Sequence, residues 1–235
     1  LSQQQRGPGA ARNRGVEAVE TEFVAFLDAD DWYAPDKLER SLDVLRELGA
    51  TCLATDAWQV NGQRIERRKN QQREVPSVLT KELLIGDNPI ICSTIVANRK
   101  KVLDLGGFDE SSELIATEDY DLWLRLSHDE PIAYLSEPLT FYRAHVGGLS
   151  SNERFMRGIE RILAKVATTH SGEAHFAQLI AKRRAAVRCN VAYDLLREGR
   201  RSEAQQMLRE ANRLAPSWKS YKLWLRSMLP ARSAQ

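Results

Sequence analysis

The stretch Phe23-Val-Ala-Phe-Leu-Asp28-Ala-Asp30-Asp31 decides the fold, because it is an apolar run that stops at three carboxylates. The run is short and rich in aromatic and β-branched residues, which predicts a buried strand over 23–28. In open α/β sheets, ligands bind where the strands end. Three acids at one strand end repel one another and lose hydration unless a cation lies among them. A divalent metal that holds a phosphate is the cation that such a carboxylate set favours.

The same three acids also suit a turn that caps the next helix, which Pro35 would begin. That helix is predicted over 35–48, because its leucines recur at helical spacing. The face that we expect to be buried carries Leu38, Leu42, Leu45 and Leu48.

Strand and helix signals alternate through the first 150 residues, which indicates the α/β class. Further strands are predicted at 50–55, 90–97, 132–135 and 139–142. Shorter helices are predicted near 77–85, at 99–105 and at 118–128, and Thr117 would cap the last of them. Asn61-Gly62 is a turn signal, which favours a hairpin or loop over 61–76.

After Ser150 the strand signals stop, and residues 153–169, 173–198 and 202–214 have helical periodicity. The last two segments resemble one tetratricopeptide-like helix pair, with glycine at the turn. One such pair cannot form a solenoid, which needs about three repeats. We therefore expect a catalytic domain over 1–150 and a helical extension over 151–235.

Composition narrows the class of protein. The apolar fraction of 43% and charged fraction of 28% are ordinary for a soluble protein, and no run approaches the roughly 20 apolar residues of a membrane span. The net charge of +2 divides into −8 over 1–150 and +10 over 151–235. No nucleic-acid-binding motif accompanies the basic half, so we expect no nucleic-acid partner. The three cysteines lack metal-site spacing and lie in apolar surroundings, which indicates buried free thiols and a cytoplasmic location.

A second set of acids follows a glycine turn. Gly106-Gly-Phe108-Asp-Glu110 precedes Glu118-Asp119-Tyr120-Asp121, whose first acids fall in the first turn of a predicted helix. Acids there complement the helix dipole, worth about 0.3–1 kcal/mol each. A run of acids beside a glycine turn also suits a general base held on a rigid helix end.

His145 follows the strand predicted at 139–142 and precedes Gly147-Gly148. A lone histidine is usually structural, but imidazole also serves manganese, and the acidic cluster needs a further ligand. His145 is therefore a candidate ligand for a metal or a phosphate.

The tail from Pro216 to Leu229 alternates aromatic residues with cations. Trp218, Tyr221, Leu225 and Met228 share one helical face. We expect this face to dock on the rest of the chain; the alternative is an interfacial helix on a membrane.

Taken together, the motifs resemble those of the family 2 glycosyltransferases. In chain order they are Gly9-Ala-Ala-Arg12-Asn13-Arg14-Gly15, Phe26-Leu-Asp28-Ala-Asp30-Asp31, Gly107-Phe108-Asp109 with Glu118-Asp119-Tyr120-Asp121, and Tyr142-Arg143-x-His145. The match covers about residues 5–150. It implies the A-type glycosyltransferase fold, a Rossmann-like nucleotide-diphospho-sugar transferase domain, here followed by an α-helical extension.

The resemblance also implies a donor site. Arg12 and Asn13 would line the nucleotide side of the cleft, and Asp28 would contact the nucleoside. Asp30 would ligate a divalent metal, Mn or Mg, on the diphosphate, with Asp31 in support.

The catalytic residues implied by the family are Glu118 and Asp119, with Asp119 as the general base. His145 matches a position that completes the metal site in some members. A base that deprotonates the acceptor hydroxyl would act by direct displacement, so the family implies inversion at the anomeric carbon.

One departure from the family concerns the start of the chain. Family members begin with a strand and a Pro-Thr-Tyr-Asn-like loop that grips the nucleoside base, whereas this chain starts after that point. We therefore expect an N-terminally incomplete catalytic domain whose nucleotide pocket is open on one side.

The sequence therefore predicts a metal-dependent glycosyltransferase. It would move a sugar from a nucleotide-sugar, with a UDP-sugar as the favoured donor, to a glycan or lipid-linked acceptor of the cell surface. We expect it in the cytoplasm, with peripheral contact at the inner membrane face as a further expectation. One alternative is an inactive truncated domain that binds proteins through its helical tail. Another is a sugar nucleotidyltransferase, although that class usually carries a glycine-rich loop with a lysine near its start, which this chain lacks.

Overall fold

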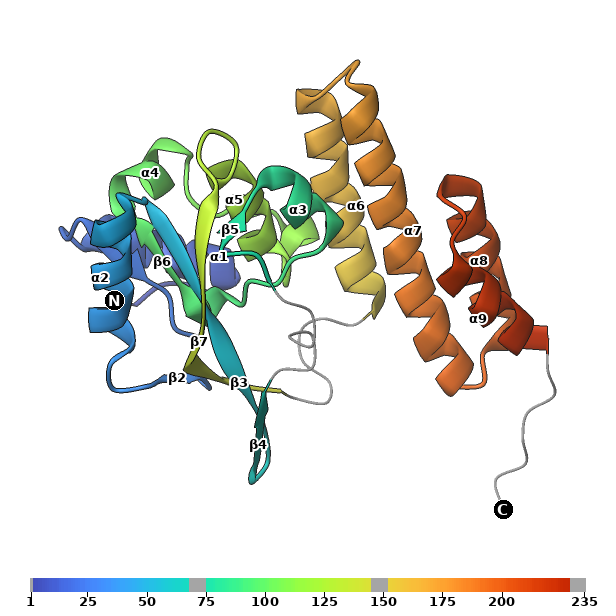
Figure 1. Cartoon of the computed structure of the whole chain (residues 1–235), viewed down its shortest axis with the longest axis horizontal. Helices are drawn as coiled ribbons and strands as arrows, with labels where there is room; N and C mark the ends of the chain where they lie inside the picture. Colours follow the sequence, from blue (N-terminus) through green and yellow to red (C-terminus); the bar gives the residue numbers. More distant parts are fainter. Residues whose placement is uncertain (1, 68–74, 145–151, 229–235) are drawn as a thin grey trace. The chain divides into compact units, whose positions relative to one another are not determined.

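The contacts of the chain divide it into two units, Leu1–Leu149 and Ser150–Gln235. The structure, a computed structural model, describes residues 2–67, 75–144 and 152–228 (Figure 1). The first unit is a sheet with helices around it, and the second is built of helices. The expected α/β class is confirmed for the first unit.

Within the described residues, seven strands form one mixed sheet with the order β1-β6-β3-β7-β2, while β4 pairs with β3 and β5 with β7. The strands are β1 (Phe23–Ala25), β2 (Trp32–Tyr33), β3 (Cys52–Asn61), β4 (Arg64–Arg67), β5 (Val78–Leu79), β6 (Ile95–Asn98) and β7 (Ile132–Arg143). β3 and β7 are parallel, and both β1 and β3 run antiparallel to β6. β1, β3 and β7 therefore point the same way, and the Asp28–Asp31 segment follows the carboxyl end of β1.

Some strands end or join differently from the sequence prediction. β1 stops at Ala25, and the acids follow in a turn in which the Asp31 N–H donates to the Asp28 carbonyl at 3.1 Å. The strands predicted at 132–135 and 139–142 are one strand, β7. Its pairing with β3 continues past Pro138, because the register shifts at Asp56, the residue opposite. Only the end of 90–97 is a strand; Cys92–Thr94 forms the 3-10 turn η2.

The helices of the first unit are α1 (Pro8–Ala18), α2 (Lys37–Leu48), α3 (Lys81–Gly86), α4 (Arg99–Asp104) and α5 (Glu118–Leu126), with a second 3-10 turn, η3, at Ser112–Leu114. In Figure 1, α2 lies to one side of the sheet and α3 and α5 to the other. The Asn61-Gly62 turn between β3 and β4 is present, with Gly62 at φ +61°. Thr117 is the N-cap residue of α5, as predicted, but its side chain makes no capping hydrogen bond, because its hydroxyl donates to the Leu114 carbonyl instead.

The face of α2 that packs on the sheet is only partly the predicted leucine face, because Leu45 is buried and Leu42 packs against the same cluster, but the two outer leucines do not. Leu38 and Leu48 are 48% and 63% exposed, whereas the buried residues of the helix are Lys37, Ser41, Val44 and Leu45. The reason is Lys37, whose ammonium donates to the Thr94 carbonyl at 2.8 Å and to the Ser41 hydroxyl at 3.1 Å. Burial lowers the pKa of Lys37 to about 7. Its hydrogen bonds, which the leucine spacing could not show, fix the rotation of α2.

The second unit consists of α6 (Asn152–Thr169), α7 (Ala174–Arg197), α8 (Arg201–Leu214) and α9 (Trp218–Met228). The first three helices match the predicted ones within two residues. Gly199, at φ +80°, makes the turn between α7 and α8. The helices approach closely there, because Ala192, Ala204 and Ala211 are completely buried between them.

α9 packs through a different face from the expected one. Its buried residues are Ser220, Leu223 and Ser227. The expected docking face is exposed instead: Trp218 by 68%, Tyr221 by 47%, Leu225 by 43% and Met228 by 56%. The helix therefore packs with its small residues and presents its aromatic residues outward.

All three cysteines are buried free thiols, as the sequence indicated. In the described part of the chain, no helix combines the length and the apolar character needed to cross a bilayer.

Candidate active site

Arg12 joins acids from two distant segments of the first unit. From α1, its guanidinium donates to Asp28 Oδ1 after β1 and to Glu118 Oε1 at the start of α5, both at 2.6 Å. The Glu118 side chain is only 5% exposed and that of Arg12 17%, whereas that of Asp28 is 36% exposed. The motifs at 9–15, 26–31 and 118–121 therefore meet around the Arg12 guanidinium, and the Asp28 carboxylate faces solvent.

Three aromatic rings fix these segments in place. Phe26 lies 5.1 Å from Phe108 and 6.1 Å from Trp123, and Phe108 lies 6.0 Å from Trp123, all between ring centroids. The rings come from the residue that follows β1, the glycine turn and α5. The Arg12 guanidinium lies 5.5 Å from the Phe108 ring centroid. Since all three rings are buried, the acids are mounted on a rigid core.

Asn13 holds the glycine turn against α1. Its amide nitrogen donates to the Phe108 carbonyl at 2.8 Å, and its amide oxygen accepts from the Phe108 N–H at 2.7 Å. Gly107 has φ +68°, and a Cβ there would clash with the Asn13 amide. Both polar atoms of the Asn13 amide are thus engaged in positioning the glycine turn.

Asp31 is a buried support for the acidic turn. Its carboxylate accepts from the Ser93 hydroxyl at 2.6 Å and from the Arg143 N–H at 2.9 Å. The same Ser93 oxygen accepts from the Asp28 N–H at 3.0 Å. Burial raises the pKa of Asp31, although both hydrogen bonds oppose the shift. Asp30, by contrast, is exposed, and its carbonyl accepts from the Arg143 side chain at 3.3 Å.

The two acids that begin α5 differ in their environments. Glu118 is engaged on both oxygens, because Oε1 pairs with Arg12 and Oε2 accepts from the Ala116 N–H at 2.7 Å. Ala116 is held at φ +78°, which is rare for a residue with a Cβ. Burial, and then the neighbouring Glu118 charge, raise the pKa of Asp119 to about 7. A carboxyl group with that pKa suits a general base near neutral pH, while Glu118 is better suited to positioning.

The acids fit one type of metal site. In the described residues, no group of three or more His, Cys, Asp or Glu side chains could hold a metal by itself. His145 lies outside the described residues. Mg²⁺ and Mn²⁺ in nucleotide sites usually take one or two carboxylates and complete their shell with phosphate oxygens. Asp30, with an exposed side chain next to the solvent-facing Asp28, fits that arrangement.

Ser93 is the residue that sequence reasoning missed. It is completely buried in η2, and Lys37 fixes this turn by binding the Thr94 carbonyl. A signal was available, because Ser93-Thr94 is a polar pair inside an apolar run, and buried hydroxyls need partners. Which partners they have depends on folding, since Ser93 reaches an acid 62 residues away.

We expect Ser93→Ala to lower the free energy of unfolding by about 1–3 kcal/mol, because it removes a partner from a buried carboxylate and a backbone N–H. For a chain of this size, that lowers the Tm by about 2–4 °C per kcal/mol. Thermal unfolding followed by circular dichroism measures the shift. Ser112→Ala, at an exposed serine, is the matched control. Equal Tm values for the two variants would contradict the bridging role of Ser93.

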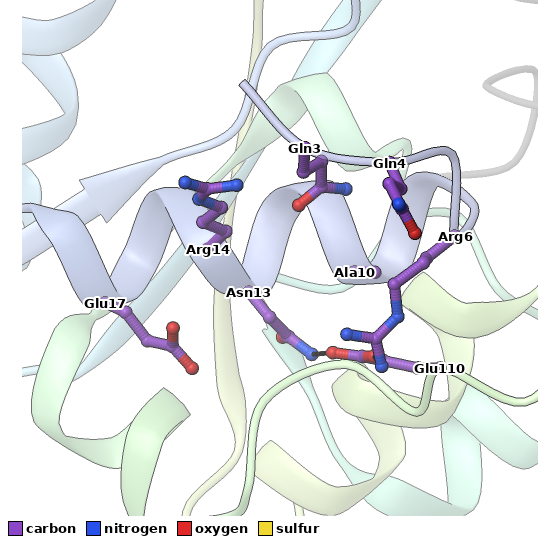
Figure 2. Close-up of a pocket in the computed structure, with 8 residues that line it drawn as sticks. All are labelled: Gln3, Gln4, Arg6, Ala10, Asn13, Arg14, Glu17 and Glu110. Carbon is purple, nitrogen blue, oxygen red and sulfur yellow. Dashed lines mark hydrogen bonds and ion pairs between the residues drawn. The ribbon is translucent and has the colours of Figure 1, made fainter. Parts of the chain in front are cut away.

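A separate pocket of about 410 Å³ lies along α1 (Figure 2). Its lining includes Arg6, Asn13, Arg14 and Glu110. The lining does not include the acids at 28–31 or those at 118–119. Arg6 pairs with Glu110 at 2.7 Å, and Arg14 donates to the Ser2 carbonyl. We place the candidate site at the Arg12 acids instead, because the carboxyl groups with raised pKa values, Asp31 and Asp119, lie there.

Known proteins resemble this chain in sequence and in fold. The model of the family described as "Glycosyltransferase like family 2" matches residues 1–204. Bacillus subtilis TuaG, named for teichuronic acid biosynthesis, is 27% identical over 155 residues, which are 63% of this chain and 56% of TuaG. Escherichia coli WfgD, named as a UDP-Glc:α-D-GlcNAc-diphosphoundecaprenol β-1,3-glucosyltransferase, is 27% identical over 150 residues, again 63% of this chain and 56% of that protein. Bacillus subtilis EpsH is 50% identical over 42 residues, only 12% of its length. The chain thus spans little more than half, or less, of these relatives.

Solved structures share the fold. S. aureus TarS aligns with a TM-score of 0.63 and 20% identity, covering 95% of this chain and 39% of TarS. A TarS fragment in complex with UDP-GlcNAc aligns with a TM-score of 0.62 and 19% identity, covering 97% of this chain and 71% of the fragment.

Proposed function

Because this chain belongs to the family 2 glycosyltransferases, we propose that it transfers a sugar from a nucleotide-sugar to a hydroxyl acceptor, with the donor bound at Asp28 and Asp30 and with Asp119 as the base. The proposed outcome is inversion at the anomeric carbon, because one base and one direct displacement are sufficient for it.

One observation carries this proposal: Arg12 binds Asp28 and Glu118 together, and Glu118 precedes Asp119, whose pKa is raised to about 7. Transfer requires these two functions side by side, since the acceptor hydroxyl loses its proton as the sugar leaves the diphosphate. The carboxyl end of β1, where the acids lie, is also where ligands bind in open α/β sheets.

Each residue of the site has a proposed part. Asp28 contacts the nucleoside, and Asp31 holds the acidic turn through Ser93 and Arg143. Arg12 and Asn13 form the wall of the nucleotide side. Glu118 keeps Arg12 in place, which leaves Asp119 to take the acceptor proton.

The cofactor in this proposal is Mn²⁺ or Mg²⁺, held by Asp30 together with diphosphate oxygens. When bound, such an ion stabilises the charge that develops on the leaving diphosphate. His145 remains a proposed further ligand.

The names of relatives guide the choice of substrates. TarS structures contain UDP and UDP-GlcNAc, and WfgD is named for UDP-Glc and a diphosphoundecaprenol acceptor. We therefore propose a UDP-sugar donor and a glycan or lipid-linked acceptor for cell-surface polysaccharide. This proposal places the protein in the cytoplasm, where it works at the inner face of the membrane.

The donor site is tested by titrating UDP into the full chain in a calorimeter, with and without manganese. We expect manganese-dependent binding that Asp30→Ala weakens at least tenfold, because the ion then loses its protein carboxylate. Asp36→Ala is the matched control, since Asp36 is an exposed acid six positions further on, and its side chain makes no capping hydrogen bond. Manganese-independent binding, or equal losses in both variants, would count against the metal site. No UDP binding by a folded chain would favour the non-enzymatic alternative.

A further inference from the structure

The outward surface of α9 is divided into an apolar arc and a basic arc. At 100° per residue, Trp218, Tyr221, Leu225 and Met228 occupy one arc of the helix, and Lys219, Lys222 and Arg226 occupy the neighbouring one. All seven residues are exposed. We call these seven residues the α9 face.

The aromatic part of this face is ordered. The rings of Trp218 and Tyr221 stack, with centroids 5.6 Å apart and planes inclined by 21°. The Lys222 ammonium lies 5.2 Å from the Trp218 ring centroid. The structure therefore presents a preformed aromatic surface with a cation at its border.

The contacts on the other side of the helix hold the α9 face outward. Ser220 and Ser227 are buried, and the Ser220 hydroxyl donates to Asn212 Oδ1 of α8 at 2.6 Å. At the edge of the basic arc, Lys219 donates to Asn190 Oδ1 of α7 at 2.8 Å. Because hydroxyls and an amide anchor the helix, rotating the aromatic residues inward would bury these polar groups without partners.

The charge and composition of the α9 face indicate what kind of partner binds to it. Lys222 and Arg226 border the apolar arc, and residues 151–235 carry a net charge of +10. An apolar arc with Trp and Tyr beside Lys and Arg is the composition of a helix that lies in a membrane interface. Aromatic rings with one polar end favour the headgroup level.

We propose that the α9 face lies in the headgroup region of a bilayer that contains anionic lipid. Four large apolar side chains then leave water, and the basic arc meets lipid phosphates. This contact does not depend on the transfer reaction, so it can hold or fail whatever the outcome of the UDP titration.

The test is co-sedimentation of the full chain with vesicles of phosphatidylcholine alone, or of phosphatidylcholine mixed equally with phosphatidylglycerol. We expect binding to the anionic vesicles, and we expect it to weaken as salt is added. Lys222→Gln with Arg226→Gln should weaken it about 25-fold, since each cation near an anionic surface is worth about fivefold. Trp218→Ser with Leu225→Ser should abolish detectable binding.

The controls are matched residues on the first unit. Leu48→Ser removes an exposed leucine and Lys100→Gln an exposed lysine, and neither should change vesicle binding. Circular dichroism shows whether each variant is folded. A second readout is quenching of tryptophan fluorescence by brominated lipid, which we expect in the wild type and expect Trp218→Phe to reduce.

Three results would overturn the proposal. They are absence of binding to anionic vesicles, binding that the α9 variants and the controls share equally, and quenching unchanged in Trp218→Phe. A dimer in light scattering that Trp218→Ser converts to a monomer would assign the face to a second copy of the chain instead.

Discussion

Asp119→Asn is expected to lower the rate of sugar transfer by a factor of about 10²–10⁴ while leaving UDP affinity within about twofold. Asparagine keeps the shape of the side chain but cannot accept the acceptor proton. UDP release from a donor that the wild-type chain turns over measures the rate, and calorimetry measures the affinity. In the wild type, kcat/KM should fall below a pH of about 7, because protonated Asp119 is no longer a base. An equal loss of binding and transfer would contradict this role.

The same variant tests the pKa of Asp119 without a substrate. A raised pKa means that the folded chain favours the protonated form, so this contribution to stability is present below pH 4 and is lost by about pH 7. Asparagine stays neutral. The Tm advantage of Asp119→Asn over wild type should therefore grow between pH 4 and 7 and then level off. Asp129→Asn, at an acid with a side chain 87% exposed, is the control and should show no such rise.

The sequence was most informative where one local pattern was sufficient. Helical periodicity placed the ends of α6, α7 and α8 within two residues, because the apolar residues that each helix buries recur at helical spacing within its own sequence. The apolar run that ends at Asp28 located the acidic turn, even though β1 stops at Ala25. In both cases the residues that determine the structure are neighbours in the chain.

Prediction was wrong where a distant polar partner decided the outcome. The rotation of α2 depends on a lysine that reaches the Thr94 carbonyl, 57 residues away. Ser93 bonds with groups of the acidic turn that no spacing within η2 indicates. The face with which α9 docks includes Ser220, whose hydroxyl bonds to Asn212 of α8. Apolar patterns report burial, but they do not report which polar groups satisfy one another, and at this site those pairs set the geometry.

The bridge made by Arg12 gives the second large effect. Arg12→Met is expected to lower the free energy of unfolding by about 3 kcal/mol, because it leaves the buried Glu118 carboxylate without its counter-charge. The corresponding loss in Tm is about 6–12 °C. UDP affinity should fall as well, since Asp28 loses the partner that fixes its carboxylate at 2.6 Å. Thermal unfolding and calorimetry on the same preparations measure both effects.

A double variant separates loss of the bridge from loss of packing. Adding Glu118→Gln to Arg12→Met neutralises the stranded carboxylate, so much of the lost stability should return while donor binding stays weak. Arg14→Met, two residues further along α1 at an exposed position, is the control and should change stability by no more than about 0.5 kcal/mol. If the double variant were as unstable as the single one, the methylene packing of Arg12 on Phe108 would be the important interaction, and the charge bridge would not.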